Sequence, residues 1–169
     1  MNSFWEQFSG AELRQGDYLL KCPVAIHSPR TTNEQEITVQ EGDLIVMTQS
    51  CDLENAKARF VALCPIFSIG EFERANPVLA RKGAWENVRK GRIESLHLLG
   101  SPVDPANSRD SLVVDFREIY SLPFELLSRL AENQGPRWRL KSPYLEHFSQ
   151  AFARFFMRVG LPSSIPPFK

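Results

Sequence analysis

The side chains best suited to chemistry follow the apolar run at residues 44–47. They are Thr48, Gln49, Ser50, Cys51 and Asp52. This polar turn brings a thiol, two hydroxyls, an amide and a carboxylate to one end of a predicted strand. Cys51 becomes a nucleophile if a nearby base converts it to the thiolate. The histidines available as that base are His27, His97 and His147, all distant in sequence.

A structural role for this turn is the competing interpretation, and we favour it. A carboxylate at Asp52 opposes a thiolate at Cys51, because the two negative charges repel. In the structural interpretation Cys51 is a small, buried apolar side chain. Ser50 and Asp52 then accept hydrogen bonds from backbone amides of the turn. Catalysis by Cys51 with Asp52 stays open as the alternative.

Metal and cofactor sites are not indicated. Side chains of the metal-ligand type are present at Cys22, Cys51, Asp52, Cys64 and His97. Their spacing matches no zinc pattern, because structural zinc sites take ligands in close pairs. The sequence also lacks the local signatures of phosphate loops, dinucleotide folds, zinc proteases, serine hydrolases and kinases. We expect no metal and no cofactor, and we lean towards a protein that is not an enzyme.

Two basic segments form the second candidate site. Their cations are Arg81, Lys82, Arg89, Lys90 and Arg92 in the first, and Arg137, Arg139, Arg154 and Arg158 in the second. Cations neutralise phosphates, and an exposed indole at Trp85 or Trp138 can stack on an unpaired base. The alternative is a solvated basic face with both indoles in the core, where Trp is mostly found.

Length and composition describe one folded domain over residues 1–169. Hydrophobic residues make up 43% and charged residues 24% of the chain, which is globular rather than disordered composition. The three cysteines form no CxxC pair, which favours a reducing compartment and a cytoplasmic location. The chain start lacks the pattern of a signal peptide, and no apolar run approaches the roughly 20 residues of a membrane span. We expect no membrane association.

Periodicity and turn residues predict an α+β fold. Strands are expected at residues 18–22, 37–39, 44–47, 60–64, 93–99 and 112–120, with Pro65 ending the fourth. Helical segments are expected at residues 71–88, broken by Pro77 and Gly83, at 124–132 and at 143–159. Residues 2–8 are predicted to form a short helix or an aromatic plug.

The last predicted helix has the clearest pattern. Its apolar residues, at spacings of 3, 4, 3 and 4 along one face, are Leu145, Phe148, Phe152, Phe155 and Val159. We expect this face to dock on the sheet. The opposite polar stripe carries His147, Gln150, Arg154 and Arg158.

The first part of the chain is similar to a known bacterial family. Gly16-Asp17 opens the first strand, Leu44 to Met47 forms the next, a polar turn contains Asn55, and a further strand ends at Pro65. This order resembles the SH3-like barrel of MazF/PemK-type toxins, which are ribonucleases of toxin–antitoxin systems. The family has Arg-Pro where this chain has Asp43-Leu44, and Thr where it has Ile66. The resemblance therefore implies the barrel without the residues that cleave RNA.

The predicted architecture is a small curved antiparallel sheet, or SH3-like barrel, with the C-terminal helices packed on it. Residues 11–70 form the barrel-like core, 71–122 a mixed insertion with strands, 123–160 the C-terminal helices and 161–169 a proline-rich tail. The Thr48–Asp52 turn and residues 152–162 are also similar to bacterial proteins without an assigned function.

The favoured function is a bacterial RNA-binding module of a toxin–antitoxin or phage-defence system. A protein-interaction or adaptor module is the first alternative, and a cysteine-dependent enzyme using Cys51 is the second. The expected partner is RNA or another protein, and a homodimer is open. Clustering of the basic side chains on one face favours the first function. An exposed apolar patch near the C-terminus favours the second, and a histidine beside Cys51 favours the third.

Overall fold

The computed structural model describes residues 3–28, 36–55 and 57–157, and within them the chain has the α+β composition that the sequence predicts. The strands are β1 (Trp5–Phe8), β2 (Tyr18–Ser28), β3 (Glu36–Val46), β4 (Phe60–Ser68), β5 (Leu96–Leu99), β6 (Leu112–Asp115), β7 (Tyr120–Pro123) and β8 (Arg137–Leu140). The helices are α1 (Ser50–Glu54), α2 (Ile69–Ala75), α3 (Ala84–Arg89), α4 (Phe124–Gln134) and α5 (Tyr144–Phe156), with 3₁₀ turns η1 (Pro77–Ala80) and η2 (Ser108–Asp110).

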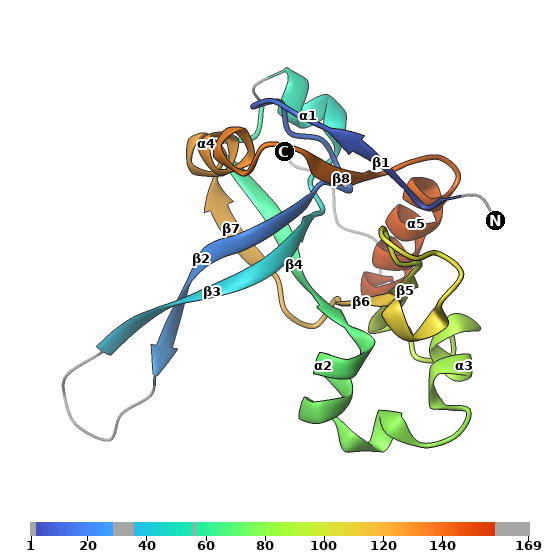
Figure 1. Cartoon of the computed structure of the whole chain (residues 1–169). Helices are drawn as coiled ribbons and strands as arrows, with labels where there is room; N and C mark the ends of the chain where they lie inside the picture. Colours follow the sequence, from blue (N-terminus) through green and yellow to red (C-terminus); the bar gives the residue numbers. More distant parts are fainter. Residues whose placement is uncertain (1–2, 29–35, 56, 158–169) are drawn as a thin grey trace, which may run out of the picture.

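The main sheet is antiparallel and is organised around β4. Its strand order is β2-β3-β4-β6-β5, and β7 pairs with the first half of β4. The strands β2 and β3 extend from the body as a long two-stranded ribbon (Figure 1). In the part of the chain that the structure describes, neither sheet closes on itself. The α+β class is therefore confirmed, and the sheets seen here are open.

The strand β4 continues through Pro65, so the prediction that this proline ends the strand is wrong. Leu44 of β3 is the partner of Pro65, and the pairing of β4 with β6 begins at Ile66 with Val114. The proline thus lies where β4 changes partners, and its missing N–H interrupts neither ladder. The two predicted strands at residues 37–39 and 44–47 are likewise one strand, β3.

The N-terminal segment is a strand, so the predicted short helix is wrong, whereas the alternative of an aromatic plug agrees with the burial of Trp5 in the main core. β1 pairs with β8 in an antiparallel two-stranded sheet, with Trp5 opposite Leu140 and Phe8 opposite Arg137. The Trp5 side chain is buried, and its indole N–H donates a 2.7 Å hydrogen bond to the Gly100 carbonyl. The partner strand is more than a hundred residues away, which explains why local sequence patterns did not reveal β1.

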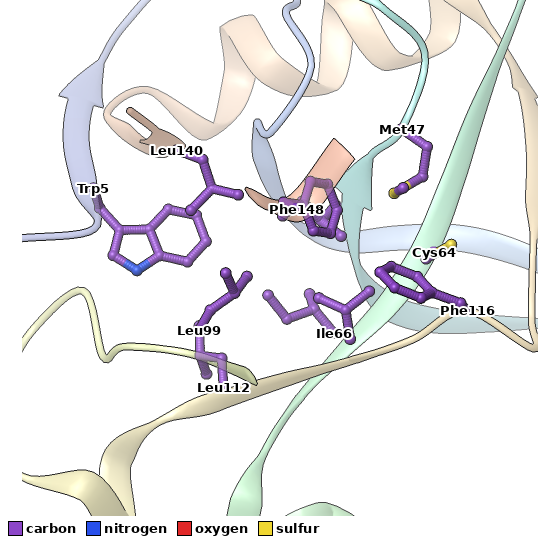
Figure 2. Close-up of a cluster of buried hydrophobic side chains, with 11 residues drawn as sticks. Trp5, Met47, Cys64, Ile66, Leu99, Leu112, Phe116, Leu140 and Phe148 are labelled. Carbon is purple, nitrogen blue, oxygen red and sulfur yellow. The ribbon is translucent and has the colours of Figure 1, made fainter. Parts of the chain in front are cut away.

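The main hydrophobic core lies between the sheet and α5. Its buried residues include Trp5, Met47, Cys64, Ile66, Leu99, Phe116, Leu140 and Phe148 (Figure 2). Phe148 is fully buried, and Phe152 packs edge-on against Phe116 with ring centroids 5.3 Å apart. The predicted docking of the Phe-rich face is confirmed, with Phe152 and Phe155 only partly buried. Val159 lies outside the described residues.

A separate cluster positions the region between β4 and β6. Phe72 of α2 and Val88 of α3 are buried against Leu96 of β5 and Val113 of β6. Pro77 and Gly83 interrupt the helical segment as the sequence predicts, so that α2, η1 and α3 are separate elements. This cluster fixes α3 beside β5.

We expect Phe148→Ala to lower the free energy of unfolding by roughly 3–5 kcal/mol, the range for truncating a buried Phe. The side chain is fully buried between α5 and the sheet, so its loss leaves a cavity. Urea denaturation followed by circular dichroism measures the effect. Met157→Ala, at a side chain that is 76% exposed, is the control and should change stability by less than about 0.5 kcal/mol. Equal effects of the two substitutions would contradict the docking of α5.

Candidate anion-binding site

Two of the arginines expected on a nucleic-acid surface are buried. Arg137 is 1% exposed and Arg139 is 6% exposed, and both pair with Asp17, which is fully buried. The Nε atoms of Arg137 and Arg139 lie 3.0 Å and 2.5 Å from the two carboxylate oxygens of Asp17. Residues two apart in a strand point to the same face, so β8 presents both guanidinium groups to one acid. The prediction that these arginines contact nucleic acid is therefore wrong.

The buried arginines also donate hydrogen bonds to main-chain carbonyls. Arg137 donates to the carbonyls of Gly10 and Glu12, and Arg139 also donates to Glu12. Both guanidinium groups lie over the ring of Phe8, with that of Arg139 3.8 Å from its centroid. The free-energy cost of burying two cations is thus offset by one carboxylate, by main-chain oxygens and by an aromatic face.

The polar turn after β3 braces the fold through its hydroxyls. Thr48 Oγ1 accepts a 2.8 Å hydrogen bond from the amide of Ala62. Ser50 Oγ accepts a 3.1 Å hydrogen bond from the amide of Gln15, and Ser50 also begins α1. Ser50 thus joins the turn to a distant segment, whereas the prediction gave it an amide of its own turn.

The structural interpretation is wrong about the burial of Cys51 and about the hydrogen bonds of the Asp52 side chain. Cys51 is exposed and not buried, because it lies on the outer side of α1. Its Sγ lies 3.8 Å from Gln49 Oε1 and 3.9 Å from Asp52 Oδ1. Asp52 receives the amides of Lys57 and Ala58 on its main-chain carbonyl rather than on its carboxylate. Among the described side chains, the contacts of this thiol are Gln49 and Asp52, and neither is a histidine that could act as its base.

The other predicted cations that the structure describes lie on the surface around α3 and α5. Arg81 and Lys82 are exposed in the turn before α3. Arg89 and Lys90 both pair with Glu86, at 2.7 Å and 3.1 Å. Arg92 donates to Asn87 Oδ1, Arg154 is exposed on α5, and Arg158 lies outside the described residues.

The structure brings part of this set together at one pocket. A cavity of about 260 Å³ lies between α3, β5 and α5. Its polar lining consists of Arg89, Lys90, Glu94, His97, His147 and Arg154. The apolar part of the lining includes Val88, Leu96 and Ala151. Segments some fifty residues apart in sequence therefore converge at this place, with α5 passing beside β5 (Figure 1).

His97 is the least exposed polar group in the pocket. Its ring lies 6.0 Å from that of Phe116 and 5.6 Å from that of Phe148, measured between centroids. Burial lowers the pKa of His97 to about 4, with further contributions from His147 and Arg154. At neutral pH this imidazole is uncharged, so it can donate one hydrogen bond and accept another.

The sequence did not identify the histidines or Glu94 as members of this site. The available signal was the polar stripe on the last helix, because His147, Ala151 and Arg154 share one face at spacings of four and three. Nothing in the sequence pairs that face with residues 88–98.

Within the described residues, no three side chains of His, Cys, Asp or Glu gather in a way that could hold a metal ion.

Comparisons with known proteins give no functional information, so function is inferred from the geometry of the site. No protein-family model matches the chain, and no curated protein matches it. None of the helices in the described ranges is both long enough and apolar enough to span a membrane.

We expect Asp17→Asn to lower the free energy of unfolding by roughly 3–5 kcal/mol, because it leaves two buried guanidinium groups without their counter-charge. Chemical denaturation at neutral pH measures the loss. Glu125→Gln makes the same change of charge at an exposed residue of α4, where the pair with Arg129 spans 3.8 Å. That control should change stability by less than about 1 kcal/mol, as is usual for exposed ion pairs. Similar losses in both variants would show that the buried carboxylate has no special role.

The lowered pKa of His97 predicts a pH-dependent contribution to stability. Its pKa is about 4 in the folded protein and about 6.5 in an unfolded chain, so between these values only the unfolded state binds a proton. Stability should therefore fall as the pH drops from 6.5 to 4, by up to about 3 kcal/mol at 1.36 kcal/mol per pKa unit. Denaturation curves of the wild type and of His97→Leu test this, because the variant should lose that part of the slope. An unchanged slope in His97→Leu would contradict the assignment.

Alkylation should distinguish the three thiols. Burial raises the pKa of Cys22 and of Cys64 to about 12, and both side chains are buried, whereas Cys51 is exposed. Iodoacetamide at about pH 8 should therefore modify Cys51 first in the folded protein, because the accessible thiolate is the reactive species. Mass spectrometry of peptides from short reaction times measures the order. Urea-unfolded protein is the control, and there the three rates should converge.

Proposed function

We propose that this protein binds RNA through phosphate contacts at the pocket between α3 and α5. The observation that carries the proposal is the convergence of Arg89, Lys90 and Arg154 from two distant segments at one cavity. Cations gathered on one face neutralise phosphates and release their counterions, which is the main source of affinity for nucleic acid. The exposed Arg81 and Lys82 extend the basic surface towards the start of α3.

His97 supports RNA over DNA as the ligand. The 2′-hydroxyl that distinguishes RNA both donates and accepts a hydrogen bond. The neutral imidazole of His97 offers the complementary acceptor and donor at the same pocket as the cations. A toxin–antitoxin or phage-defence setting is part of the proposal and rests on the sequence resemblance of residues 11–70 alone, since the sheets of the described residues are open.

The binding surface is small, and base stacking contributes little to it. The Trp85 indole is partly buried and donates a 2.8 Å hydrogen bond to Glu73, while Trp138 packs against the main core. Neither ring is arranged as an open platform for an unpaired base. The proposal therefore rests on phosphate contacts by a few side chains, and it predicts modest affinity with a moderate dependence on salt.

A protein partner is the second candidate, because apolar side chains are exposed near the end of α5. Phe156 is 55% exposed and Met157 is 76% exposed. Two adjacent exposed apolar side chains can serve as an anchor for another chain. Purification of the protein, with identification of copurifying RNA and protein, separates the two candidates.

We expect the affinity for a short single-stranded RNA to fall with salt at a logarithmic slope between about −0.7 and about −2, for one to three phosphates neutralised at about −0.7 each. Arg154→Ala should reduce the magnitude of that slope by about 0.7, because it removes one of the three cations at the pocket. Fluorescence anisotropy titrations between 50 and about 200 mM salt measure it. Arg129→Ala is the matched control, because Arg129 is an exposed arginine of α4 paired with Glu125. The absence of RNA binding at the lowest salt would refute the proposed function.

A further inference from the structure

The size of the pocket restricts the group that it can accept. Its volume of about 260 Å³ lies just below the usual range of roughly 300–1,000 Å³ for small-molecule sites. The buried cluster behind it, which includes Val88 and Leu96, closes one side. A phosphate with part of its sugar fits such a space, whereas several consecutive nucleotides do not. The cavity therefore takes one end or one group of a ligand.

The charges of the lining favour a group with more than one negative charge. Arg89, Lys90 and Arg154 face the cavity together with a single carboxylate, that of Glu94. Glu86 holds Arg89 and Lys90 from outside the lining through exposed ion pairs. Such pairs contribute little stability, so a bound anion can replace or share them. A phosphomonoester carries a charge of about −1.5 to −2 at neutral pH, whereas an internal phosphodiester carries one negative charge.

The arrangement of hydrogen-bond donors around the pocket also favours a phosphomonoester. A terminal phosphate has three free oxygens, and the lining supplies cations from two directions, α3 and α5. An arginine fork binds two phosphate oxygens at once, and a lysine binds one. His97 and His147 add ring nitrogens beside these cations.

We infer that this pocket recognises a terminal phosphomonoester, as found at the phosphorylated end of an RNA strand or on a free mononucleotide. The inference rests on the proposed function for its RNA ligand, and it adds that the strand is held by its end. Arg154 approaches from α5, and Arg89 and Lys90 approach from the opposite wall at α3. An internal segment of the strand lacks the third free oxygen and the second charge that this arrangement matches.

The test compares one short RNA sequence in three forms, with a 5′-phosphate, with a 3′-phosphate and with hydroxyls at both ends. We expect a phosphorylated end to bind about tenfold or more tightly than the hydroxyl form, the gain from one charge-assisted hydrogen bond. Arg154→Ala should abolish this preference, and Arg129→Ala should retain it. Thermal melting of both variants verifies that they are folded. Mononucleotide and inorganic phosphate, added as competitors, identify the smallest group that occupies the site.

The outcomes separate this inference from the proposed function. Equal binding of all three RNA forms overturns the recognition of an end and leaves RNA binding in place. Binding of the mononucleotide without binding of any RNA overturns the proposed function and supports a phosphomonoester site for free nucleotides. Competition by inorganic phosphate that persists unchanged in Arg154→Ala overturns the assignment of the pocket. Binding of neither RNA nor mononucleotide overturns both.

Discussion

The buried pairing of Asp17 with Arg137 and Arg139 is the contact on which the position of α5 depends. It joins the turn before β2 to β8, and the chain passes from β8 almost directly into α5. Next to it the amide of Leu140 donates a 3.0 Å hydrogen bond to the Gly16 carbonyl. A Cβ on Gly16 would lie 2.9 Å from that of Leu140, and its φ of 83° suits glycine, so only glycine permits this approach. The cluster thereby fixes where α5 begins.

The opposite wall of the pocket is held by a different set of contacts. Glu73 of α2 accepts the indole N–H of Trp85 on α3 and also receives both terminal nitrogens of Arg109, at 3.0 Å and 2.9 Å. A capping box between Ser68 and Glu71 fixes the start of α2. The short helix α3 is thus anchored through its neighbour rather than through its own length. Cations on anchored elements lose less freedom when they bind, which suits them to a small ligand.

Some arginines of this protein are buried and others are exposed, and the surrounding structure decides which. Arg137 and Arg139 stabilise the fold because β8 aims both at Asp17, whereas Arg89 and Arg154 remain at the surface beside a cavity. The residue type is the same in both cases, and both kinds of arginine come from segments with an excess of basic residues. A basic segment in a sequence therefore indicates a surface for anions only if no buried acid lies opposite. Here that acid is 120 residues away.

The sequence by itself determined the elements whose causes are local. The α+β class, the breaks at Pro77 and Gly83, the helix before Gly135 and the buried face of α5 follow from periodicity and caps within a few residues. Tertiary structure alone decided that residues 5–8 form a strand and that β4 passes through Pro65, because strand pairing joins distant segments. It also buried two predicted binding arginines and assembled His97, His147 and Arg154 at one pocket. Charge burial and pocket formation depend on which segments meet, and the spacing within any one segment does not contain that information.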